Sequence, residues 1–117
     1  MPRVPNEPTI QNLIELSFQI HYRARNVYRE LAKRFSHHEP SAALWKSLTE
    51  DEEAQAQVLT DVLVNATVEK LVSPVPADTW ANAKRIWHLV HQDLLATVKN
   101  LKDAHGIAYQ LEYLEVK

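Results

Sequence analysis

Apolar residues recur every three or four positions between residues 9 and 35, which is the period of one face of an α-helix. Pro8 stands near the expected first turn, where the missing amide hydrogen of proline is tolerated. The pattern predicts a helix over about residues 9–35. The positions on its inward face are Ile10, Ile14, Ser17, His21, Ala24, Tyr28, Leu31 and Phe35.

A second helix is predicted over about residues 40–66. Pro40 disfavours the helical conformation at Glu39 and is well placed to open the next helix. The spacing of three and four then resumes for more than six turns. The inward positions are Ser41, Trp45, Leu48, Glu52, Gln55, Leu59, Val62 and Ala66.

Two prolines near residue 75 interrupt the pattern, and Asp78 is a good N-cap for a third helix over about residues 78–102. Gly106 stands where a helix C-cap is expected, because glycine readily takes the left-handed conformation there. We therefore expect a short fourth helix over about residues 107–117. It is apolar at Ile107, Ala108, Leu111 and Leu114.

These elements predict an all-α fold, an antiparallel bundle of three long helices and a short C-terminal helix, since short connections favour antiparallel neighbours. Residues 1–8 contain three prolines and are expected to form a loose arm before a single helical domain over residues 9–117. Three and a half helices leave one apolar side of the core open. We therefore expect a homo-oligomer.

The amino-acid composition excludes several kinds of functional site. The chain has one glycine and no cysteine, so phosphate-binding glycine loops, disulfides and thiolate metal sites are excluded. The formal net charge of −2 provides no basic surface for nucleic acid. No apolar run approaches the roughly 20 residues of a membrane span, and no signal-peptide core is present. A cytoplasmic location is expected by default.

Polar residues occupy inward positions on both long helices, at matching heights. With the turn centred near His38, His21 lies about 17 residues before it, and Glu52 and Gln55 lie about 14 and 17 after it. The three side chains should therefore meet. A buried carboxylate costs several kcal/mol unless it is paired or coordinated, so Glu52 requires a partner.

The same reasoning brings His88 and His91 of the third helix to this level, and a folded-back fourth helix would add Glu112. Imidazoles and carboxylates on neighbouring helices are suitable ligands for iron, manganese or zinc. The alternative is a buried hydrogen-bond network, in which His21 donates to Glu52. Spacing leaves both interpretations open.

Two segments, HYRARNVYRELAKRF over 21–35 and WKSLTEDEEAQAQVL over 45–59, resemble the first two helices of the ferritin-like superfamily, and within it the rubrerythrin-like proteins. In that family a ligand Glu is followed seven residues later by Tyr and then by an apolar–Ala pair, as Tyr28, Leu31 and Ala32 are here. On the second helix an aromatic residue precedes Glu-x-x-His and a further apolar residue, and Trp45, Glu52 and Leu59 match these positions.

The ligand positions depart from the family pattern. His21 replaces the first Glu, Gln55 replaces the His, and AYQLEYLEV resembles the start of a third family helix with Glu112 at the ligand position. The resemblance implies a ferritin-like bundle and iron or peroxide redox chemistry. The altered set implies one ion rather than two, with Tyr28 donating a hydrogen bond to a ligand. Together with the spacing argument, the candidate metal ligands are His21, Glu52, Gln55, His91 and Glu112, and His88 or a second subunit could also contribute.

Two other functions stay open. One is a metal-free relative that serves as a helical module for oligomerisation or partner binding, because Gln55 is a poor ligand. The other is a small-molecule site within the bundle, lined by Trp45, Trp87 and the histidines.

Overall fold

The computed structural model describes residues 7–91 and 94–116, with side chains placed at 7–90 and 94–111. The regular structure of these residues is helical apart from one isolated β-bridge between Thr9 and Pro74. This confirms the predicted all-α class. None of the described helices is both long and apolar enough to cross a membrane.

Helices α1 (Ile10–Arg34) and α2 (Glu39–Asn65) form a long antiparallel hairpin. A capping box starts α1: the Thr9 hydroxyl accepts from the Asn12 amide at 3.2 Å, and the Asn12 side chain accepts from the Thr9 amide at 2.9 Å. These bonds satisfy two amides that have no partner within the helix. At α2 the His38 Nδ1 atom accepts from the Ser41 amide at 3.4 Å, and Pro40 lies in the first turn.

The prediction of one helix over residues 78–102 is wrong. After the short α3 (Val68–Leu71), α4 (Ala77–His91) ends early, and a 3-10 turn, η1 (Leu94–Thr97), follows. Helix α5 (Leu101–Val116) begins directly after Asn100, whose side chain accepts from the Asp103 amide at 3.0 Å. This capping interaction starts a new helix inside a segment whose apolar periodicity continued without a break.

Gly106 does not cap a helix as expected. It lies inside α5, and its φ angle is not positive. The fourth helix is accordingly longer than predicted.

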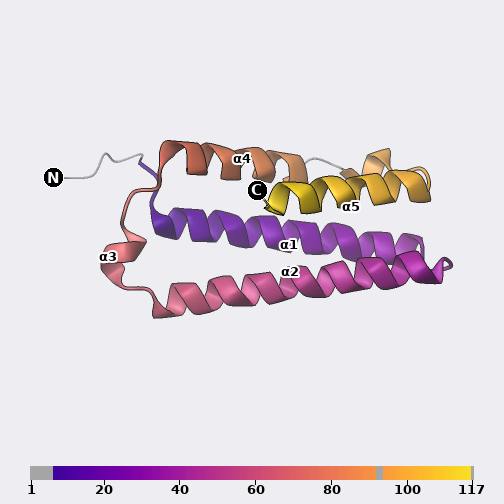
Figure 1. Ribbon diagram of the computed structural model, residues 1–117, viewed down its shortest axis with the longest axis horizontal. Coiled ribbons are helices and arrows are strands. Elements are labelled where there is room, and N and C mark those ends of the chain that lie inside the picture. The colour runs from indigo at the N-terminus through magenta and orange to yellow at the C-terminus, as the bar shows by residue number, and fades with distance from the viewer. Residues whose placement is uncertain (1–6, 92–93, 117) are drawn as a thin grey trace.

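The helices run in an up-down-up-down order along a long, flat molecule of 58 × 26 × 18 Å (Figure 1). In the view of Figure 1, α1 lies between α2 and the two helices α4 and α5, and α5 also contacts the first turns of α2. The Cα radius of gyration is 16.4 Å, compared with about 13 Å for a compact chain of this length. The described helices therefore form an extended layered bundle, and the finer ferritin-like arrangement stays a prediction.

The hydrophobic core is concentrated where α5 covers the α1–α2 hairpin. Trp45, Tyr28 and Leu31 are fully buried there. Towards the other end of α2, Val58 and Val62 are exposed, and α4 packs mainly on α1. The core consists of Ile20, Ala24, Val27, Tyr28, Leu31, Trp45, Val90, Ala104, Ile107, Ala108 and Leu111.

The start of α1 is anchored to the segment that follows α3, at the end of the predicted loose arm over residues 1–8. The Pro8 carbonyl accepts from the Val75 amide at 3.0 Å, and the Ile10 amide donates to the Ser73 carbonyl at 2.9 Å. Residues 1–6 lie outside the described residues.

Candidate functional site

His21 on α1 and Glu52 on α2 meet across the hairpin, as the sequence predicts. The His21 Nδ1 atom lies 2.5 Å from Oε2 of Glu52, and the Glu52 side chain is 1% exposed. His21 is 16% exposed, so the imidazole closes the side of the pair that is nearer to solvent. The proton between the two atoms can be assigned to either group, depending on the protonation state and tautomer of the imidazole.

Burial explains why this contact matters. A carboxylate without a partner in such a place would cost several kcal/mol, and a charge-assisted hydrogen bond offsets much of that cost. Thr49 and Trp45, one and two turns before Glu52, are also buried, so the carboxylate lies on the inward face of α2. The pair is therefore built into the packed interface between the helices.

Gln55 does not join the pair, because its side chain is exposed. It stands three residues after Glu52, which turns it by about 60° around the helix. Gln55 lines a cavity of about 240 Å³ that also includes His21 and residues of α4. The predicted burial of Gln55 is thus wrong, because the space between Gln55 and α4 is an open cavity.

Tyr28 is fully buried two turns beyond His21 on α1. Its proposed role as a hydrogen-bond donor to a ligand stays a prediction.

Helix α4 ends near the level of the pair. The Arg23 Nε–H donates to the Val90 carbonyl at 3.1 Å, so the last turn of α4 lies near the level of His21. His88 is exposed. The side chains of His91 and Glu112 lie outside the described residues, so their predicted ligand roles stay predictions. No three His, Asp or Glu side chains converge within the part of the chain that has described side chains.

A cavity of about 200 Å³ opens beside the pair, between α1 and α2. Arg25 and Glu53 bring opposite charges to its wall, next to His21 and Glu52. Solvent-sized molecules can therefore approach the buried carboxylate on this side.

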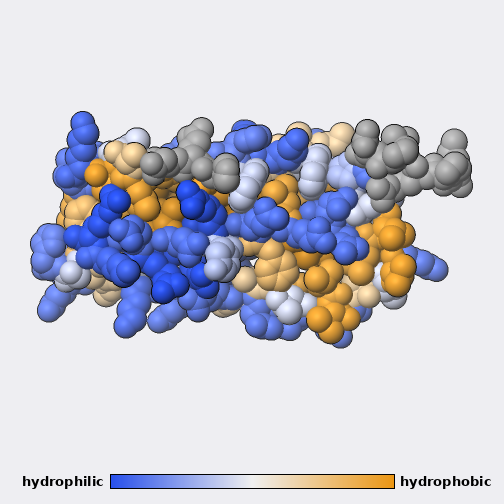
Figure 2. Space-filling model, turned by 180° about the vertical axis from the view of Figure 1, so that it is seen from behind, coloured by the Kyte–Doolittle hydropathy of each residue, from blue (hydrophilic) through white to orange (hydrophobic). Residues whose placement is uncertain are grey.

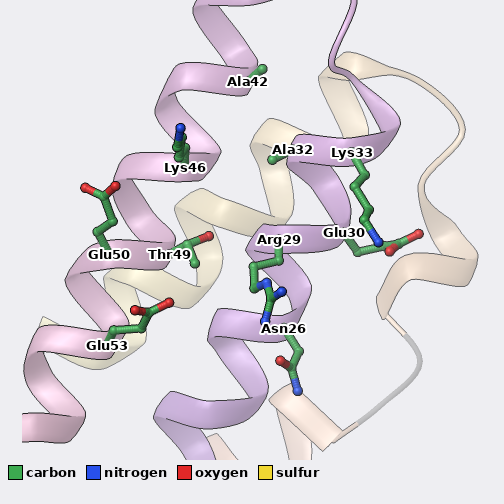
Figure 3. Close-up of a pocket in the computed structure, with 10 residues that line it drawn as sticks. All are labelled: Asn26, Arg29, Glu30, Ala32, Lys33, Ala42, Lys46, Thr49, Glu50 and Glu53. Atoms are coloured by element: carbon green, nitrogen blue, oxygen red, sulfur yellow. The ribbon is translucent and has the colours of Figure 1, made fainter.

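A larger groove of about 680 Å³ continues along the same two helices towards the hairpin turn (Figure 3). Thr49 and Glu53 point from α2 towards α1, whereas Glu50 points away. Seen from behind, hydrophilic residues gather over this half of the molecule and hydrophobic residues lie more towards the α3 end (Figure 2). Arg29, Lys33 and Lys46 mix with the acidic residues, so the groove has no single sign of charge.

Sequence spacing did not reveal a contact between α2 and α5. The Ser41 Oγ atom lies 3.1 Å from Nε2 of His105, and the His105 ring centroid is 4.9 Å from that of Trp45. The indole nitrogen of Trp45 is buried and has no hydrogen-bond partner among the described residues. Only the return of α5 over the hairpin brings these residues together, and they are about 60 positions apart in sequence.

Comparisons with protein-family models, curated proteins and solved structures found no match.

Proposed function

We propose that the protein binds a single divalent transition-metal ion between α1 and α2, with Glu52 and His21 as ligands. The observation that carries the proposal is the buried Glu52 carboxylate in contact with an imidazole nitrogen, beside a cavity that solvent can enter. A carboxylate oxygen and an imidazole nitrogen together suit iron, manganese or zinc.

The geometry of the pair is compatible with one ion. Two ligand atoms at about 2.1 Å from a metal, at right or tetrahedral angles, stand roughly 3.0–3.4 Å apart. The two atoms are now 2.5 Å apart. An ion would therefore replace the shared proton and open the pair by less than about 1 Å. Water, His91 or Glu112 would fill the remaining positions.

The residues do not fit a dinuclear centre of the ferritin type. Such a centre needs carboxylates that bridge two ions, together with Glu-x-x-His pairs. Glu52 is the one carboxylate at the hairpin site whose side chain is described and buried, and His21 cannot bridge. A single iron ion would supply redox chemistry towards oxygen or peroxide, which is the chemistry that the family resemblance implies.

A second candidate function follows from the same pair. The His21–Glu52 contact already satisfies the buried carboxylate, so the hairpin can be stable without an ion. The protein would then be a metal-free helical module whose exposed surfaces bind a partner or a second copy.

Elemental analysis distinguishes the two functions. Protein made without a histidine tag is stripped with a chelator, incubated with iron(II), manganese(II) or zinc(II), and desalted. We expect about one ion per chain to be retained, and we expect Glu52→Gln to lose it. Asp51→Asn is the matched control, because Asp51 is the exposed neighbour of Glu52, lies outside the cavity beside the pair and should retain the ion.

The metal proposal fails if the folded protein retains none of the three ions. It also fails if Glu52→Gln and Asp51→Asn retain equal amounts. Either result would favour the metal-free module.

A further inference from the structure

A separate cavity of about 480 Å³ lies between α1 and α4. Three of its six lining residues are aromatic, and none is acidic. It shares Tyr22 with the cavity beside Glu52, but neither member of the His21–Glu52 pair lines it. Its volume lies in the range of about 300–1,000 Å³ that is usual for small-molecule sites. The lining residues are Phe18, Gln19, Tyr22, Arg23, Asn26 and Trp87.

Arg25 holds two of these lining residues in place. Its guanidinium carbon lies 4.2 Å from the centroid of the Tyr22 ring, and its Nη2 atom donates to Oδ1 of Asn26 at 3.2 Å. The cation–π contact orients the ring of Tyr22, which is 59% exposed even with Arg25 against it. The bond to Asn26 uses the amide oxygen and leaves the amide hydrogens available. Two walls of the cavity are therefore organised before any ligand arrives.

Arg23 contributes a positive charge to the same cavity. Its Nε–H donates to the Val90 carbonyl, and this bond anchors the side chain across α1 and α4. The two terminal nitrogens of the guanidinium are left to bind a ligand. Arg23 is half-buried, and no carboxylate forms an ion pair with it within the described side chains. A planar guanidinium in such a place is suited to bind a carboxylate through two parallel hydrogen bonds.

We propose that this cavity binds a planar aromatic molecule that carries a carboxylate. The aromatic ring would pack against Trp87, Tyr22 and Phe18, since aromatic side chains favour stacked or edge-to-face contacts. The carboxylate would bind Arg23, and the amides of Gln19 and Asn26 would donate further hydrogen bonds. This site does not depend on the metal proposed at Glu52.

Three probes with the same ring and different charge test the proposal by isothermal titration calorimetry. They are indole-3-acetate, the neutral alcohol indole-3-ethanol and the cation tryptamine. We expect the acid to bind about tenfold or more tightly than the alcohol, because a charge-assisted bond to Arg23 is lost with the alcohol. Tryptamine should bind most weakly, because its ammonium group meets a positive charge.

Substitutions test whether the three probes bind in this cavity. Arg23→Gln should abolish the preference for the acid, whereas Arg85→Gln, on the exposed side of α4, should retain it. Tyr22→Ala should weaken all three probes, and Tyr109→Ala is its matched control on α5, since both tyrosines are largely exposed. Circular dichroism confirms that each variant is folded.

The proposal is overturned if none of the probes binds, or if the acid and the alcohol bind equally to the unmodified protein. It is also overturned if Tyr22→Ala and Tyr109→Ala have the same affinity for the acid. If Arg23→Gln does not fold, the three-probe comparison on the unmodified protein still decides. Metal retention at Glu52 is measured separately, so the failure of one proposal does not imply the failure of the other.

Discussion

The Ser41 hydroxyl oxygen and the Nε2 atom of His105 lie 3.1 Å apart, and this contact joins the first turn of α2 to α5. Ser41 is 3% exposed, whereas His105 is exposed. If Ser41 is lost, water can bind the exposed His105 in its place. If His105 is lost, water reaches the buried Ser41 hydroxyl less easily.

This difference predicts unequal effects of the two alanine substitutions. Ser41→Ala leaves His105 open to water, so we expect a loss of about 1 kcal/mol in the free energy of unfolding. His105→Ala leaves a buried hydroxyl without this partner and removes a ring from Trp45, so we expect about 2 kcal/mol. Urea unfolding measures both values. His88→Ala, on exposed α4 surface, is the control, and equal losses at Ser41 and His105 would contradict the expected asymmetry.

The His21–Glu52 pair should be energetically coupled. Glu52→Ala removes a buried carboxylate and its hydrogen bond, so we expect the free energy of unfolding to fall by about 2–3 kcal/mol. Glu53→Ala should change it by less than about 0.5 kcal/mol, because Glu53 is exposed.

A double-mutant cycle with His21→Ala measures the coupling directly. We expect an interaction free energy of about 1 kcal/mol or more for residues in contact. The cycle is carried out in the presence of a chelator, so that it reports the pair without an ion. Additive effects of the two substitutions would show that the contact does not stabilise the hairpin.

Gly106 offers a stabilising substitution. It lies inside α5 without a positive φ, and a Cβ atom added there would meet nothing within 4 Å. Gly106→Ala should therefore stabilise the protein by about 0.5–1 kcal/mol, because alanine loses less conformational freedom in a helix. Thermal unfolding followed by circular dichroism checks the result. A lower melting temperature would show that Gly106 caps a helix after all.

The exposed apolar face of α2 predicts self-association. Leu44, Val58 and Val62 are 41%, 59% and 47% exposed, and their spacing of fourteen and four residues places them on one face of the helix. Because these apolar side chains are exposed in a single copy of the chain, we expect a second copy to bury this face.

Light scattering tests this expectation. The protein should have at least twice the mass of one chain, and the double substitution Val58→Glu and Val62→Glu should shift it to the monomer. Val64→Glu is the matched control, since Val64 is 74% exposed but lies on a different face. A monomeric unmodified protein at high concentration would contradict the expectation.

Local signals in the sequence were sufficient for the hairpin and for the meeting of His21 with Glu52. Periodicity defined the inward faces of the two helices, and a short turn at 35–38 left little freedom in their relative height. Counting residues from that turn therefore placed the imidazole and the carboxylate at one level. The same counting failed for Gln55, because a position on a helix is buried only where another helix covers it.

The helical class, the two long helices and the buried polar pair could all be predicted from the sequence, because they follow from periodicity, capping and one tight turn. The contact of His105 with Ser41 and the aromatic cavity beside Arg23 could be found only from the folded structure. Each of these depends on how α4 and α5 lie across α1 and α2. Packing between segments that are distant in sequence is the sum of many weak contacts, and it produces no repeating pattern of residues that could be recognised in the sequence.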